Sequence, residues 1–197
     1  LAIMNAPLEP MSVVACAGSG KTRTAVRRLA EIRKRLGDHR GRVVLLSFSN
    51  VAVDTFRQSY QSLVQELSAG AGRDRVEIDT LDGFITSNVL RPHGHRTMGC
   101  DRTPFLIAGT EPFLRNKDLR FWVQSATEDF PVQPVDMRKV VVNLQAGTAL
   151  FHYQQHNALL PINNGPAVAA RLAEVGAYTH NQGRYWCYRA LLGQPGL

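Results

Sequence analysis

The amino-acid sequence predicts an α/β fold with a mostly parallel sheet, and three observations support this prediction. The stretch VVACAGSGKTRTAV, Val13 to Val26, has the pattern of a strand, a glycine loop and a helix in direct succession. The run RVVLLSFSN is continuously apolar over its first half, as buried parallel strands are. The order strand, loop, helix, strand, helix, strand continues to Thr80 and is typical of parallel strands joined by helices.

The glycine loop has the spacing A-x-x-x-x-G-K-T, with Ala15 where the phosphate-binding loop (P-loop) signature usually has its first glycine. Gly18 and Gly20 can adopt positive φ, so successive backbone N–H groups can turn inward beside the N-terminus of the next helix. Lys21 is placed to reach the β- and γ-phosphates, and the Thr22 hydroxyl to ligate Mg²⁺. The loop therefore predicts a nucleotide site made of Ala15, Cys16, Ala17, Gly18, Ser19, Gly20, Lys21 and Thr22.

The next two elements follow from apolar spacing. Apolar residues at Ala25, Leu29, Ile32 and Leu36 predict a helix packed on a sheet, and Gly37 is expected to end it. The apolar run that follows it predicts a central strand covered on both faces.

A second helix and a third strand come next. Asn50 is expected to cap the N-terminus of this helix. One face of the helix carries Val53, Phe56, Tyr60, Leu63 and Leu67 before the break at SAGAG. The stretch RVEIDT predicts a third strand, and a short helix is expected from about Leu81.

The character of the sequence changes after Arg91. RPHGHRTMGCDRTP is polar and favours turns, and short mixed elements follow at PFLIAG, RFWVQS and KVVVNL. Asn164 and Pro166 are expected to start a helix that carries Val168, Leu172 and Val175. THNQ predicts a capping box for a last helix, which Gly193 and Pro195 end. We therefore expect a P-loop core over residues 1–91 and a mixed α+β and helical insertion subdomain over residues 92–197.

Composition limits the class of protein. A chain of 197 residues with 44% hydrophobic residues can build a real core, and no apolar run approaches the length of about 20 residues that spans a bilayer. With no signal peptide before the first strand, we expect a cytoplasmic protein without a membrane partner. Cys16, Cys100 and Cys187 are too few and too widely spaced for a disulfide framework. The net charge of +7 is compatible with a polyanionic partner.

Three stretches together carry a family resemblance. ACAGSGKTRTA, VVLLSFSNVAVDTF and VEIDTLDGFI resemble, in order and spacing, the first three motifs of the UvrD/Rep-like superfamily 1 DNA helicases. The resemblance covers Val13 to Phe84, and YTHNQGRYWCYRALL resembles the segment that precedes the family's Walker B strand. It implies an incomplete RecA-like P-loop NTPase fold and an ATP-dependent DNA helicase, with ATP and Mg as cofactors. Arg23 matches a basic residue that helps to position the nucleotide in this family.

The resemblance also implies a contact with single-stranded or partly duplex DNA. In the family the second motif, here Ser47 to Ala52, holds single-stranded DNA, and Phe48 and Asn50 match it. The third motif corresponds to residues 80–84, where Asp82 and Gly83 depart from the family pattern. The implied DNA-binding residues are Ser47, Phe48, Ser49, Asn50, Thr80 and Asp82.

The family has further motifs that fall outside this sequence. Its adenine-holding Gln would lie just before Leu1, and its Walker B strand and second RecA-like domain would follow Leu197. The resemblance therefore implies a piece of a longer helicase that binds ATP–Mg and single-stranded DNA, whose hydrolysis needs the missing parts.

Two other functions remain open at this point. The chain could be a catalytically silent module that binds nucleotide or DNA. It could also be a small P-loop kinase or GTPase in which Asp79, at the end of RVEID, ligates the metal.

Several polar and aromatic residues have an ordinary structural interpretation. His93 and His95 with Cys100, or His152 with His156, could ligate zinc, but neither set has four ligands at a recognised spacing. Trp122, Tyr153, Tyr185 and Trp186 could stack on bases, and apolar packing is the favoured role. The arginine-rich face of the first helix is best explained as solvated surface.

Overall fold

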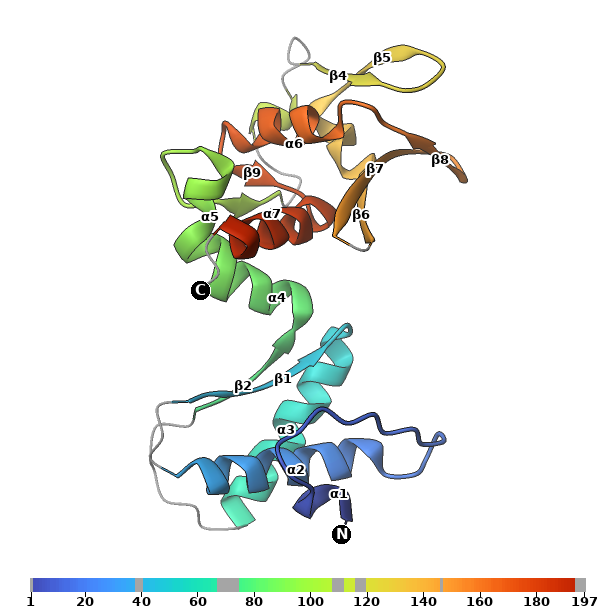
Figure 1. Ribbon diagram of the computed structural model, residues 1–197. Coiled ribbons are helices and arrows are strands. Elements are labelled where there is room, and N and C mark those ends of the chain that lie inside the picture. The colour runs from blue at the N-terminus through green and yellow to red at the C-terminus, as the bar shows by residue number, and fades with distance from the viewer. Residues whose placement is uncertain are drawn as a thin grey trace. The chain divides into compact units, whose positions relative to one another are not determined.

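The computed structural model describes residues 2–37, 41–66, 75–107, 112–115, 120–145 and 147–193. The chain divides into two compact units, Leu1–Leu81 and Asp82–Leu197 (Figure 1). The boundary between the units falls after Leu81, earlier than the boundary expected after Arg91. Helical structure runs without a break from Leu81 to Met98, so the chain has no linker at Arg91.

The first unit is a parallel strand pair packed on two helices. It contains α1 (Ala2–Asn5), α2 (Lys21–Leu36), β1 (Val43–Ser47), α3 (Asn50–Glu66) and β2 (Val76–Thr80). The strands are parallel, with Val43 opposite Val76 and Ser47 opposite Thr80. Helices α2 and α3 supply most of the buried cluster under the strands, which consists of Val26, Leu29, Val53, Tyr60 and Ile78.

Two expectations about the sheet of this unit are wrong. The stretch that begins at Val13 forms no strand, and Val14 is 96% exposed. Within the described residues β1 pairs with β2 alone, so it is not a central strand. Val43 and Leu45 pack against the buried cluster, whereas Val44 and Leu46 on the opposite face stay about 40% exposed. A strand with only one neighbour and helices on one face cannot be covered on both.

Both helices of the unit follow their apolar patterns. Helix α2 ends at Gly37, whose φ of 50° lies in the left-handed region that glycine tolerates. Helix α3 begins at Asn50, but its cap is Ser49: the Ser49 carbonyl accepts a hydrogen bond from the Val53 N–H at 3.0 Å. The predicted cap was thus one residue too late. Val53 and Tyr60 are buried as expected, and Leu67 lies outside the described residues.

The short helix expected from about Leu81 is present, and the helical structure continues past Arg91, where a turn-rich stretch was expected. Helix α4 (Leu81–Ile85), a π-helical turn η1 (Thr86–Leu90) and α5 (Arg91–Met98) follow one another directly. The Arg91 N–H donates to the Thr86 carbonyl, a wider turn than that of an α-helix. Pro92 stands in the first turn of α5, where its missing N–H costs least. The polar composition of this stretch thus did not reveal the helix.

Short strands fill the middle of the second unit. β4 (Phe121–Gln124) pairs with β5 (Asp129–Val132), and β6 (Val140–Gln145), β7 (Thr148–Gln155) and β8 (Ala158–Pro161) form an antiparallel sheet. β3 (Phe105–Leu106) pairs in parallel with β9 (Ala177–Tyr178). The 3₁₀ turns η2 (Pro112–Arg115) and η3 (Pro134–Lys139) lie between strands. The expected elements at PFLIAG, RFWVQS and KVVVNL are therefore confirmed as β3, β4 and β6.

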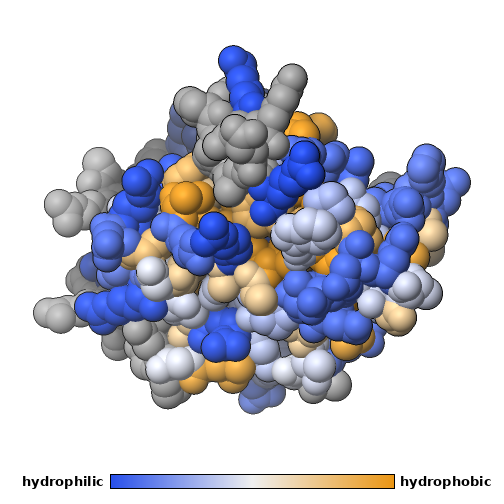
Figure 2. Space-filling model, turned by 90° about the horizontal axis from the view of Figure 1, so that it is seen from above, coloured by the Kyte–Doolittle hydropathy of each residue, from blue (hydrophilic) through white to orange (hydrophobic). Residues whose placement is uncertain are grey.

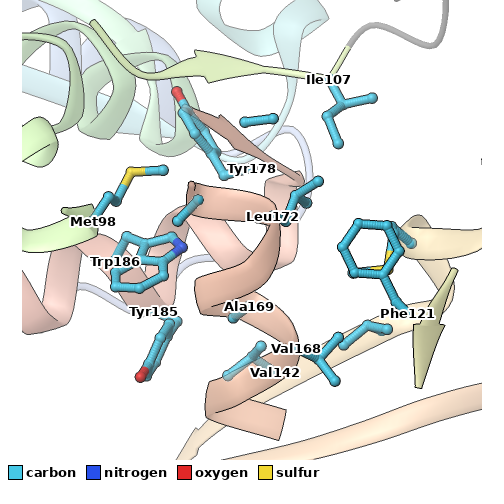
Figure 3. Packing of buried hydrophobic residues seen from close by; sticks show 14 of the residues in the cluster. Met98, Ile107, Phe121, Val142, Val168, Ala169, Leu172, Tyr178, Tyr185 and Trp186 are labelled. Carbon is cyan, nitrogen blue, oxygen red and sulfur yellow. The ribbon is translucent and has the colours of Figure 1, made fainter. Parts of the chain in front are cut away.

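Helices α6 (Gly165–Ala173) and α7 (His180–Gly193) organise the core of this unit. Figure 3 shows Val168, Ala169 and Leu172 between Phe121 and Trp186. Helix α6 begins at Gly165, with Asn164 in the N-cap position and Pro166 in the first turn as expected. The Asn164 side chain, however, bonds the backbone of β4 instead of that of the helix. Val175 lies beyond the end of α6 and is 39% exposed.

The predicted capping box of α7 is confirmed. The Thr179 hydroxyl accepts a hydrogen bond from the Gln182 N–H, and the Gln182 amide oxygen accepts one from the Thr179 N–H, both at 3.3 Å. Both residues are buried, so these bonds satisfy backbone donors that water cannot reach. Tyr185 and Trp186 on the same helix are 5% exposed and pack as expected, whereas Trp122 on β4 is 59% exposed. Gly193 ends the helix as predicted, and Pro195 lies outside the described residues.

Exposed apolar residues are scattered over the surface that Figure 2 displays. Hydrophobic side chains show there as small separate patches among hydrophilic ones. Among the described residues no helix combines the length and the apolar character needed to cross a bilayer. The described cysteines are free thiols, and burial raises the pKa of Cys187.

Gly165 permits the close approach of α6 to the sheet, which generates a prediction. A Cβ atom at Gly165 would lie 2.1 Å from Cγ of the buried Phe151. Gly165→Ala should lower the free energy of unfolding by about 1–3 kcal/mol, because the ring must leave its packed position. Gly193→Ala, whose Cβ meets no atom within 4 Å, is the matched control. Urea unfolding of both variants measures the difference, and equal stability would contradict this account of the packing.

Candidate nucleotide and nucleic-acid site

The predicted nucleotide loop is formed and exposed. Gly18 and Gly20 have φ of 76° and 79°, the positive values that only glycine adopts at little cost. The Ser19 N–H and hydroxyl both donate to the Cys16 carbonyl, at 3.3 and 2.7 Å, and close the loop. All residues from Ala15 to Gly20 are exposed.

The loop leads directly into α2, whose first residue is Lys21. The ammonium group of Lys21 folds back over the loop and donates to the carbonyls of Cys16 at 2.6 Å and Ala15 at 3.1 Å. Gly20 occupies the N-cap position of α2, and no side chain caps this end of the helix. The first turn of α2 contains no acidic residue. The free N–H groups of this turn and the Lys21 ammonium therefore form a concentration of hydrogen-bond donors that suits an anion.

Thr22 and Arg23 lie in the same first turn of α2. Thr22 is half-buried, and both residues line a hollow of about 380 Å³ between α2 and α3. The structure thus brings together all residues that the sequence assigned to the nucleotide.

The predicted DNA-contacting residues lie at the carboxyl end of the strand pair. Ser47 ends β1 opposite Thr80 at the end of β2, so the sheet register brings these hydroxyl residues side by side. Phe48 follows β1 directly and is 85% exposed, and Asn50 is the first residue of α3. The Ser49 N–H donates to the Ser47 hydroxyl at 3.3 Å, which shapes the connection between them. An exposed aromatic ring beside hydroxyl and amide groups suits contact with a single strand of nucleic acid.

Asp82 lies in the second unit, where its carboxylate is engaged. Arg184 on α7 donates to both oxygens of Asp82, from Nε at 2.9 Å and from Nη2 at 3.1 Å. This bidentate hydrogen bonding raises the pKa of the Arg184 guanidinium. His180 Nδ1 lies 4.0 Å from the same carboxylate. The geometry makes Asp82 a partner of α7.

Asp79, the metal ligand of the kinase or GTPase alternative, is also engaged. Its Oδ1 accepts a hydrogen bond from the Thr80 N–H at 2.7 Å and lies 3.6 Å from Nη2 of Arg57. Arg57 in turn donates from Nε to the Ile78 carbonyl at 2.9 Å. A carboxylate held by a guanidinium and a backbone donor is a poor ligand for a divalent cation. In the described part of the chain, no group of three or more His, Cys, Asp or Glu residues could hold a metal ion.

Sequence reasoning missed one part of this region, a pair of arginines that fasten the N-terminal segment to α2. Arg28 donates to the carbonyls of Ile3 and Pro7, at 2.5 and 2.9 Å, and Arg35 donates to those of Met4 and Ala6 at 3.2 Å. The spacing of Arg28 and Arg35 by two helical turns is the signal in the sequence, but nothing there identifies a backbone as their partner.

A family of known proteins matches most of the chain. The family model of the UvrD/REP helicase N-terminal domain matches residues 1–159. No curated protein and no solved structure matches the chain.

Proposed function

The chain belongs to the UvrD/REP helicase family, and we propose that it is the part of an ATP-dependent DNA helicase that binds ATP–Mg and single-stranded DNA. The glycine loop and the first turn of α2 carry this proposal, because they gather exposed backbone donors around Lys21. The family match makes a nucleoside triphosphate the natural ligand of such a loop.

Within this proposal residues 1–91, which include the whole first unit and the beginning of the second, are the partial RecA-like core. Residues 92–197 are the insertion subdomain. The parallel pairing of β1 and β2 through α3 supports the first part. The separate buried core around α6 and α7 supports the second. In the complete helicase, nucleotide-driven closing and opening of two RecA-like domains would step the protein along a single strand.

The residues of the loop fit a triphosphate. Lys21 donates to two carbonyls of its own loop, and phosphate oxygens are stronger acceptors that would replace them. Thr22 would hold Mg²⁺ through its hydroxyl, and Arg23 would contact the nucleotide. Bound ATP–Mg supplies the phosphoryl group, whereas the protein residues bind it and orient it.

The DNA contacts in this proposal are made by Ser47, Phe48, Ser49, Asn50 and Thr80. The exposed Phe48 ring offers a stacking surface, and the neighbouring side chains and N–H groups can bond phosphate oxygens. Asp82 is the least suited of the residues assigned to DNA. Its carboxylate would repel phosphate and already pairs with Arg184.

The first test concerns the nucleotide. Lys21→Ala should abolish binding of ATP–Mg, because it removes the point charge that neutralises the β- and γ-phosphates. Lys34→Ala, at an exposed position on the same helix, is the control and should bind as the unchanged chain does. Isothermal titration calorimetry measures both. Equal affinities for all three proteins would exclude the assigned role of Lys21.

The second test concerns DNA. Phe48→Ala should weaken binding of single-stranded DNA by about 1–3 kcal/mol, the usual contribution of one stacked base. Val135→Ala removes another exposed apolar side chain, 61% exposed in the second unit, and should have little effect. Fluorescence anisotropy at several salt concentrations gives both affinities. A loss as large in the Val135 variant as in the Phe48 variant would refute a specific role of the ring.

The third test concerns hydrolysis. Phosphoryl transfer needs Mg²⁺ held from two sides, a group that orients the attacking water, and a cation near the γ-phosphate. This chain contributes Lys21 and Thr22, while Asp79 is held by Arg57. An arginine finger alone raises the rate of phosphoryl transfer by a factor of about 10³ to 10⁵. With Lys21 and Thr22 as the only contributors from this chain, we expect turnover near background. Phosphate release with and without DNA measures it. Rapid DNA-stimulated release, lost on Asp79→Asn, would instead favour Asp79 as a metal ligand.

A further inference from the structure

A groove runs along the first unit between α2 and α3, and at its beginning it shares Thr22 and Arg23 with the predicted nucleotide site. Thr22, Arg23, Arg27, Ser59 and Ser62 line its first part, a hollow of about 380 Å³. A second hollow of about 550 Å³ continues along α2 and shares Arg27 and Leu63 with the first. Basic residues of α2 line one part of this hollow, and apolar residues line much of the rest, namely Met4, Ala30, Tyr60, Leu63 and Val64. The two hollows together are called the α2–α3 groove.

Three cations of the α2–α3 groove are available to a ligand. The side chains of Arg23, Arg27 and Lys34 are exposed, and none of them forms an ion pair within the described residues. Glu31 also lines the groove, but its carboxylate lies 3.4 Å from Nε of Arg35. Arg23, Arg27 and Lys34 therefore present positive charge that no ion pair among the described residues neutralises.

The spacing of these cations fits an extended polyanion. Arg23 and Arg27 lie about 6 Å apart along the axis of α2, and Arg27 and Lys34 about 10 Å apart. A nucleic-acid strand carries a charge every few ångströms along its length, so several of its phosphates can face this row. The hydroxyls of Ser59 and Ser62 on the opposite wall are of the kind that bonds phosphate oxygens.

We propose that the α2–α3 groove binds the phosphate backbone of a nucleic-acid strand, as a second contact apart from Ser47–Asn50. The proposal rests on the proposed function for the identity of the polymer, and on the groove itself for the site. Arg27 is central to it, because this residue lines both hollows.

The test uses charge reversal and the salt dependence of binding. Arg27→Glu with Lys34→Glu should reduce the slope of log affinity against log salt by about 0.7 for each lost phosphate contact. Arg96→Glu with Arg120→Glu is the matched control, since these exposed residues of the second unit change the net charge equally. The probe is fluorescein-labelled oligothymidylate, and circular dichroism verifies that each variant is folded. Arg27→Gln with Lys34→Gln repeats the test without introducing negative charge.

The outcomes separate this proposal from the proposed function. If the slope of log affinity against log salt falls in the groove variants but not in the control, the proposed contact in the groove is supported. This holds whether or not Phe48→Ala weakens binding. If Phe48→Ala weakens binding but the groove and control variants behave alike, the groove is refuted and the strand-end contact stands. Failure of the unchanged chain to bind oligothymidylate would refute both. Displacement of the oligonucleotide from the groove by tripolyphosphate or polyglutamate at equal charge concentration would indicate a general anion site and overturn the assignment to nucleic acid.

Discussion

The parallel pairing of β1 with β2 is the constraint on which the first unit depends. Parallel neighbours need a long crossover, and α3 is that crossover, so its apolar face must lie against the strands. The same pairing places Ser47 beside Thr80 and starts α3 immediately beyond them. One register therefore fixes the strand ends, the start of α3 and the position of the exposed Phe48. A shift of this register by one residue would turn Ser47 and the apolar residues of β1 to the opposite faces of the strand pair.

The second unit depends on close packing around two helices. Gly165 lets α6 approach Phe151, and the capping box at Thr179 and Gln182 starts α7 inside the core. Because α7 is fixed there, its Arg184 reaches Asp82 and ties the beginning of the unit to its end. The acid in the third sequence motif therefore has a structural partner far along the chain, which explains how a residue that departs from the family pattern is accommodated.

The sequence predicted local features well and non-local ones poorly. The glycine loop, the helix ending at Gly37, the strand at RVEIDT and the capping box depend on neighbouring residues, and each is present in the structure. The expected strand at Val13 and the two-sided burial of β1 depend on which strands lie alongside, and a one-dimensional pattern does not contain that information. The helix after Arg91 was missed because its polar, proline-containing sequence continues a helix that began ten residues earlier. The arginine contacts of Arg28, Arg57 and Arg184 were missed because a basic side chain gives no sign of its acceptor.

The open side of β1 has a consequence for handling the isolated chain. Val44 and Leu46 are exposed on one face, the outer edge of β1 has no neighbouring strand among the described residues, and the apolar stretch from Val13 lies exposed nearby in the sequence. An unprotected edge beside exposed valines and leucines is a template for pairing with strands of other molecules. Self-association through this edge, growing with protein concentration, is therefore the foreseeable obstacle to purifying the chain in a monodisperse form, and polar or charged residues at Val44 and Leu46 are the natural remedy.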